Sequence, residues 1–119
     1  MIGLGGALGA IARYQLAALV QGRVPVGFPW GTFIVNISGC LVMGIVTTLL
    51  AEGLVVHPNW RFLVPIGFIG AYTTFSTFEL ETFRAVTEGD WLAGGLNVVT
   101  SVLAGYLALW IGVMLTRAM

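Results

Sequence analysis

Four long apolar stretches alternate with short segments that are rich in glycine, proline and charged residues. The apolar stretches extend over about residues 2–20, 31–51, 61–84 and 91–115. Each is close to or longer than the roughly 20 residues that an α-helix needs to cross the hydrocarbon core of a bilayer. The pattern therefore predicts an all-α membrane protein with four transmembrane helices, and the length of the chain predicts a single domain over residues 1–119.

The third stretch contains a segment that is poorly suited to a continuous helix. Gly67 and Gly70 weaken the helix because glycine has more conformational freedom to lose. The pair Thr73 and Thr74 follows, with stiff side chains that can bond to backbone groups. Non-helical backbone inside a membrane persists only where protein or a water-filled cavity satisfies its hydrogen bonds. We therefore predict a broken third helix whose break forms a binding site.

The composition supports a membrane environment and gives no indication of a nucleic-acid partner. Hydrophobic residues make up 58% of the chain and charged residues 8%, with a mean hydropathy of +0.98. Soluble domains carry about a quarter charged residues, and a chain this small could not bury so much apolar surface in one core. The formal net charge is zero, so no nucleic-acid partner is expected.

The arginines, the sole basic residues besides one histidine, give the chain no preferred orientation in the membrane. With four spans, Arg61 and Arg117 fall on the side of the termini, and Arg23 and Arg84 fall on the opposite side. Two against two provides no positive-inside bias. Copies inserted both ways round could pair about a two-fold axis, and four short helices are too few to enclose a selective path. We therefore expect an antiparallel, dual-topology homodimer.

Two polar residues inside the spans each allow two interpretations. Arg13 is either functional, with a carboxylate partner elsewhere, or it extends its charged end to the membrane surface. Asn36 either bonds to a neighbouring helix or provides a donor that lines a pore.

The chemistry available to the chain makes an enzyme improbable. One histidine, His57, lies in a polar loop, and the lone Cys40 lies among small apolar residues, so neither a metal cluster nor an acid–base pair is present. A proton-coupled exporter would need a carboxylate inside the membrane, and the candidates are Glu79 and Glu81 near the end of the third stretch. A subunit that assembles but does not transport is a third hypothesis.

An anion pathway fits the polar residues better. The hydroxyl and amide donors of Ser76, Thr77, Asn36 and Ser101 could replace part of an anion's hydration shell. Aromatic rings have electropositive edges, so Phe75 and Phe78 could also face an anion, although their helical spacing equally suits a packed core. Carbonyls freed at the break, meeting on a two-fold axis, could coordinate a hard cation such as Na⁺.

Three motifs in the same order resemble the fluoride channels of the CrcB/Fluc family. They are GGALGAIARY at residues 5–14, GTFIVNISG at residues 31–39 and GFIGAYTTFSTF at residues 67–78. The resemblance covers nearly the whole chain. Two positions depart from the family pattern, because Ala71 replaces a frequent glycine and Asn97 stands where relatives can carry an aromatic hydroxyl.

The resemblance implies a multi-pass channel in the prokaryotic inner membrane. Such channels are dual-topology homodimers with two narrow pores that export fluoride passively and relieve its toxicity, with a structural, non-transported Na⁺ at the dimer interface. By position, the pore residues would be Phe75, Phe78 and Asn36, the polar track Ser76, Thr77, Ser101, Asn97 and Glu81, the Na⁺ ligands the main-chain carbonyls of Gly70 and Thr73, and the vestibule residue Arg13.

Overall fold

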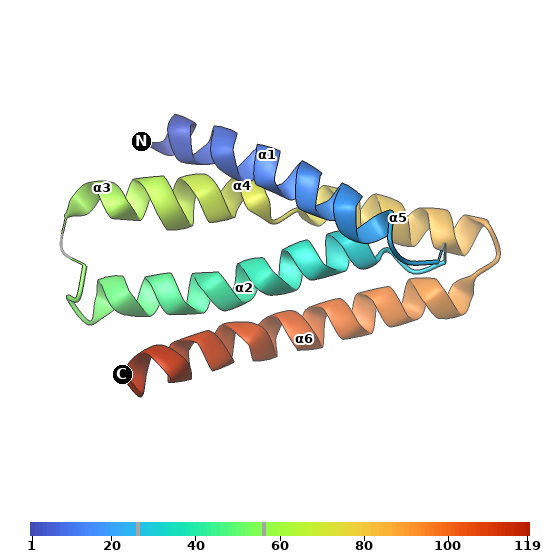
Figure 1. Ribbon diagram of the computed structural model, residues 1–119. Helices are drawn as coiled ribbons and strands as arrows, with labels where there is room; N and C mark the ends of the chain where they lie inside the picture. Colours follow the sequence, from blue (N-terminus) through green and yellow to red (C-terminus); the bar gives the residue numbers. More distant parts are fainter. Residues whose placement is uncertain (26, 56) are drawn as a thin grey trace.

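The computed structural model describes residues 1–25, 27–55 and 57–119 (Figure 1). Within these residues every regular element is a helix. The elements are, in chain order, α1 (Ile2–Gln21), α2 (Trp30–Ala51), α3 (Pro58–Arg61), η1 (Phe62–Ile69), α4 (Gly70–Tyr72), α5 (Phe75–Thr87) and α6 (Trp91–Arg117). Within the described residues, α1, α2 and α6 are each long and apolar enough to cross a membrane. The all-helical architecture predicted from the hydropathy pattern is confirmed.

Both chain termini lie at one end of the bundle, together with α3 and the carboxyl end of α2 (Figure 1). At this end the Nε atom of Arg117 lies 3.5 Å from a carboxylate oxygen of Glu52. This pair links the last turn of α6 to the end of α2. Because both side chains are largely exposed, it contributes at most about 1 kcal/mol to stability.

The third apolar stretch is interrupted between α4 and α5. Thr73 has φ −82° and ψ 154°, and Thr74 has φ −146° and ψ 121°, so both residues are extended. Helix α5 begins at Phe75, where the Thr74 hydroxyl accepts a hydrogen bond of 3.3 Å from the backbone amide of Thr77. The threonine hydroxyl caps the new helix, and the predicted break in the third helix is confirmed.

Before the break, the chain forms a π-helix, which the sequence did not predict. Helix η1 contains Pro65, which has no amide hydrogen and whose ring would collide with the carbonyl four residues earlier in an α-helix. The wider π-helical turn accommodates the ring, since its hydrogen bonds connect residues five apart. The proline is therefore accommodated by a change of helix type.

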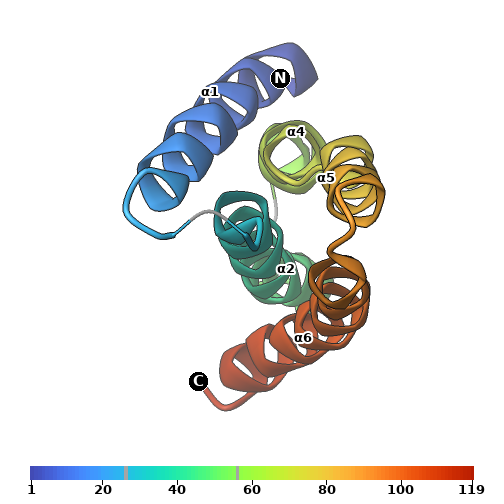
Figure 2. The ribbon, with the colours of Figure 1, turned by 90° about the vertical axis from the view of Figure 1, so that its right-hand side faces the viewer.

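Helix α2 lies in the middle of the bundle, with α1 on one side and α6 on the other (Figure 2). Small residues allow backbones to approach closely where α1 packs on η1 and where α2 packs on α6. A Cβ atom added to Gly5 would collide with the carbonyl oxygen of Leu63 in η1, and one added to Gly44 would collide with the carbonyl oxygen of Leu109 in α6. Close backbone contact of this kind holds membrane helices together where lipid offers no hydrophobic contrast.

The close contact between α1 and η1 predicts a sharp difference between two neighbouring glycines. Gly5→Ala should lower stability by about 1–3 kcal/mol, because the added methyl meets rigid backbone. Gly6→Ala is the control, since the nearest atom outside its own helix, the Gly67 carbonyl oxygen, would lie 3.9 Å from the added Cβ. Thermal unfolding in detergent should separate the two variants, and equal unfolding temperatures would contradict this packing.

Candidate functional site

The side chain of Asn36 holds the break against α2. Its Oδ1 atom accepts a hydrogen bond of 2.8 Å from the backbone amide of Thr74, and its Nδ2 atom donates one of 3.1 Å to the Thr74 carbonyl. One amide side chain therefore satisfies both backbone groups of an extended residue, as a neighbouring β-strand would. Of the two interpretations of Asn36, the interhelical hydrogen bond is present, and the side chain also lines a cavity described below.

Arg13 contacts the same region from α1. Its Nε atom donates a hydrogen bond of 3.1 Å to the carbonyl of Ala71. In a continuous helix this carbonyl would accept from the amide of Phe75. Within the described part of the chain the ion pair found is Arg117–Glu52, so the partner of Arg13 there is a backbone carbonyl and not a carboxylate.

The break also diverts the amides that would have bonded to two further carbonyls. The Thr74 amide donates to Asn36, so it does not reach the Gly70 carbonyl. The Thr77 amide donates to the Thr74 hydroxyl, so it does not reach the Thr73 carbonyl. Gly70 is exposed, and its backbone lies open on the surface of the protomer.

A narrow cavity of about 300 Å³ lies beside the break, between α2, α5 and α6. Phe75 and Phe78 both line it, with ring centroids 5.9 Å apart and ring planes at 49°. Phe78 is buried at 7% exposure, whereas Phe75 is 74% exposed and projects from the protomer. The cavity is lined by Asn36, Gly39, Cys40, Met43, Ile69, Thr73, Thr74, Phe75, Phe78, Ser101, Val102 and Leu109.

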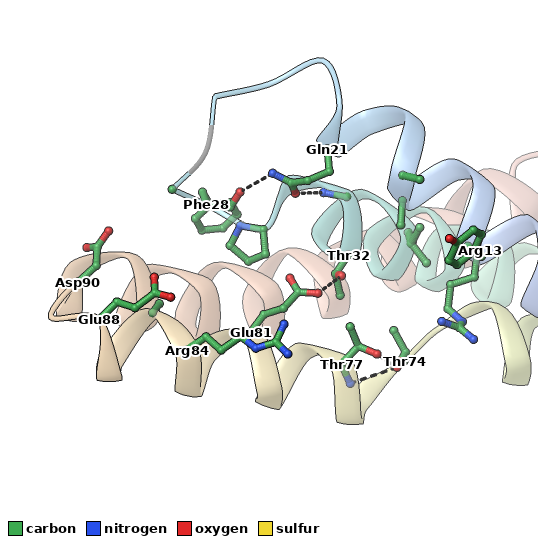
Figure 3. A pocket seen from close by; sticks show the side chains of 18 residues that line it. Arg13, Gln21, Phe28, Thr32, Thr74, Thr77, Glu81, Arg84, Glu88 and Asp90 are labelled. Atoms are coloured by element: carbon green, nitrogen blue, oxygen red, sulfur yellow. Dashed lines mark hydrogen bonds between the residues drawn. The ribbon is translucent and has the colours of Figure 1, made fainter.

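A wider and more polar cavity, the vestibule, opens on the other side of the break. It has a volume of about 550 Å³ and is lined by residues of α1, α2 and α5, including Arg13 and Thr77. Figure 3 shows Glu81 pointing toward Thr32 in its wall, and the Thr32 hydroxyl donates a hydrogen bond of 2.5 Å to the Glu81 carboxylate. Thr74 lines both cavities, so the vestibule and the narrow cavity both border the break.

The remaining predicted site residues lie in different places. Ser101 lines the narrow cavity, whereas Ser76 is exposed and is not among the lining residues of either cavity. Asn97 is 2% exposed between α5 and α6. Its Nδ2 atom donates to the Thr82 hydroxyl at 2.9 Å, and its Oδ1 atom accepts from the Ser101 hydroxyl at 3.2 Å. In this arrangement Asn97 connects two helices and contributes to the cavity through Ser101.

Three hydroxyl residues line the site or bond to a residue that supports it, and none of them was predicted as a site residue from the sequence. They are Thr32, Thr74 and Thr82. The positions of the first two carried a usable signal. Thr32 lies four residues before Asn36, and therefore on the same helical face, and Thr74 lies at the break itself. Thr82 is identified by its partner Asn97, which requires knowledge of how α5 packs on α6.

Comparison with known proteins gives a consistent result. Residues 1–113 match the family model described as CrcB-like protein, Camphor Resistance (CrcB). The chain is 50% identical over 117 residues to a protein of Solibacter usitatus named fluoride-specific ion channel FluC, covering 98% of this chain and 96% of that protein. It is 45% identical over 113 residues to a protein of the same name from Acidobacterium capsulatum, covering 95% and 90%.

Replacement of Asn36 by aspartate tests its hold on the break. Asn36→Asp keeps an acceptor for the Thr74 amide but loses the donor to the Thr74 carbonyl, and it sets a carboxylate oxygen against a carbonyl oxygen. We expect a loss of about 1–3 kcal/mol in stability, measured by thermal unfolding in detergent. Asn59→Asp, at an exposed position in α3, is the matched control. Equal unfolding temperatures for the two variants would show that Asn36 does not secure the break.

Proposed function

The chain belongs to the CrcB/FluC family of fluoride-specific ion channels, and from this membership we propose that it is a passive, fluoride-selective channel that exports fluoride from the cell. Membership of a channel family confirms the expectation that the chain is a multi-pass membrane protein and not an enzyme. The proton-coupled exporter and the non-transporting subunit are set aside on the same ground.

The observation that carries the proposal is the lining of the narrow cavity. Phe75 and Phe78 face it together with the neutral polar groups of Asn36 and Ser101. An anion that enters must exchange water for these groups. Ring edges and amide hydrogens attract an anion weakly, so it can be solvated there and still leave. The Ser101 hydroxyl, which donates to Asn97 in this structure, would turn toward the anion to contribute. A charged arginine in the same place would hold it more tightly.

The vestibule would collect the anion and deliver it to the narrow cavity. Arg13 lies there with its guanidinium partly buried, and it provides positive charge at the entrance. From the vestibule the anion passes Thr77 and the Thr32–Glu81 pair and reaches the break beside Thr74. Ser76 and Asn97 complete the polar track in this proposal, Ser76 on the exposed surface of α5 and Asn97 through its bond to Ser101.

A second, inverted copy would complete each pore. Phe75, which lines the narrow cavity, and the backbone of Gly70 are both exposed on the protomer, where a second copy could cover them. The arginine distribution permits both orientations, since Arg61 and Arg117 lie near the termini and Arg23 lies toward the opposite end. A two-fold axis through the break would bring the same residues of both copies together.

The break has the chemistry of a structural Na⁺ site. The carbonyls of Gly70 and Thr73 have lost the amides that would have bonded to them in a continuous helix, because those amides donate to Asn36 and to the Thr74 hydroxyl. Uncharged carbonyl oxygens suit a hard cation. Two such carbonyls from each of two copies would hold Na⁺ at the dimer interface, where the ion stabilises the assembly and is not transported.

Reconstitution into liposomes tests the proposed function. Purified protein in liposomes loaded with potassium fluoride, with an ionophore to carry the counterion, should release fluoride rapidly, as measured with a fluoride electrode. Liposomes loaded with potassium chloride should retain their chloride, as expected of a fluoride-selective channel. Equal release of the two anions, or release of neither, would contradict a fluoride-selective channel.

Substitution of the phenylalanines tests their role in conduction. Phe75→Ile and Phe78→Ile should each slow fluoride release about tenfold or more, as expected if the barrier rises by about 1.4 kcal/mol when ring edges are removed. Phe83→Ile is the matched control, since Phe83 lies on the same helix, is 62% exposed and lines neither cavity. If the three variants conduct equally well, the ring-edge mechanism is wrong.

A further inference from the structure

Tyr72, the last residue of α4, is tied to α2 by a directed hydrogen bond. Its Oη atom lies 2.8 Å from the Oγ atom of Ser38. The Ser38 hydroxyl has one proton, and it donates that proton to the carbonyl of Val35 at 3.0 Å. Either oxygen can donate in the Tyr72–Ser38 bond, and the Ser38 bond to Val35 favours Tyr72 as the donor and Ser38 as the acceptor.

The ring of Tyr72 is also held in place by its surroundings. It stacks on Phe68, one turn earlier, with centroids 5.7 Å apart and ring planes at 17°. On α2 it lies against Gly39, where an added Cβ would be 3.2 Å from the Tyr72 Cδ2 atom and would collide with the methyl group of Thr73. The side chain thus occupies one defined position between two helices.

This position lies between the two carbonyls proposed to bind Na⁺. Tyr72 is separated from Gly70 by one residue and is followed directly by Thr73. If Thr73 returned to helical angles, the Thr74 amide could reach the Gly70 carbonyl again, and one proposed ligand would be lost. Asn36 holds the α5 side of the break, and the Tyr72–Ser38 bond holds the α4 side.

We propose that Tyr72 and Ser38 form a positioning pair that keeps the break open and the Gly70 and Thr73 carbonyls available to Na⁺. The inference rests on the proposed cation site. Loss of the pair allows the segment to rewind, so that only part of the population is competent to bind the ion. The apparent dissociation constant for Na⁺ rises in inverse proportion to the competent fraction.

The test measures Na⁺ binding through stability and, separately, through transport. Unfolding temperature of the full chain in detergent is recorded over a series of Na⁺ concentrations, with N-methyl-D-glucamine replacing Na⁺ at constant ionic strength, because a bound ion stabilises the folded state. The variants are Tyr72→Phe, Ser38→Ala and the double variant, so the bond is removed from either side. Tyr106→Phe, at a 75% exposed position on α6, is the control.

We expect Tyr72→Phe and Ser38→Ala each to raise the Na⁺ concentration at half-maximal stabilisation about 2- to 10-fold, the range of one neutral hydrogen bond. The double variant should raise this Na⁺ concentration little more than either single variant does, because the two substitutions remove the same bond. Tyr106→Phe should reach half-maximal stabilisation at the same Na⁺ concentration as the parent. Fluoride release by Tyr72→Phe at saturating Na⁺ should equal that of the parent, because the pore-lining residues are unchanged.

The outcomes separate this inference from the proposed function. If Na⁺ raises the unfolding temperature of the parent and of Tyr72→Phe over the same concentration range, the positioning pair is wrong and the cation site stands. The same conclusion follows if the effects of the two single substitutions on the half-maximal Na⁺ concentration add fully in the double variant. If Tyr72→Phe loses fluoride release at every Na⁺ concentration, the residue acts on the pathway itself and the inference is overturned. A parent that does not respond to Na⁺ removes the cation site and this inference together, whereas liposome release of fluoride still tests the channel.

Discussion

Backbone polar groups inside a bilayer must find partners within the protein, and the break in the third helix is organised by this requirement. Two extended residues, Thr73 and Thr74, interrupt the helical hydrogen-bond pattern at membrane depth. Polar side chains within the apolar spans form hydrogen bonds with backbone groups at this interruption. Asn36 pairs with Thr74, and Arg13 takes the carbonyl of Ala71. The carbonyls of Gly70 and Thr73 lose their helical partners in the process, which is the origin of the proposed ion site.

The most buried apolar residues gather around the same place. Among the described residues Val35 and Ile69 are almost completely buried and Phe78 nearly so. Val35 precedes Asn36, Ile69 precedes Gly70, and Phe78 begins the second turn of α5. Elsewhere the helices meet through small residues, and their large apolar side chains face outward, as suits a chain surrounded by lipid. Buried apolar side chains therefore support the break in addition to its hydrogen bonds.

The sequence predicted the features that depend on local preference and missed those that depend on a distant partner. Glycines and paired threonines predicted the break, because each weakens a helix by itself. The bond from Asn36 to Thr74 joins residues 38 positions apart, so the sequence left two interpretations open. The π-helix around Pro65 was missed because proline near a helix start usually needs no such adjustment. The partnership of Asn97 with Thr82 likewise depends on how α5 meets α6.

The backbone conformation of Thr73 and Thr74 in a bilayer tests the central claim most directly. Solid-state NMR of threonine-labelled protein in lipid distinguishes extended from helical residues by their carbon chemical shifts, and the pair Thr47 and Thr48 within α2 provides a helical reference in the same sample. The structure predicts extended shifts for Thr73 and Thr74 and helical shifts for Thr47 and Thr48. Helical shifts at all four residues would mean that the third helix is continuous, and the account of the cavity, the freed carbonyls and the ion path would be wrong.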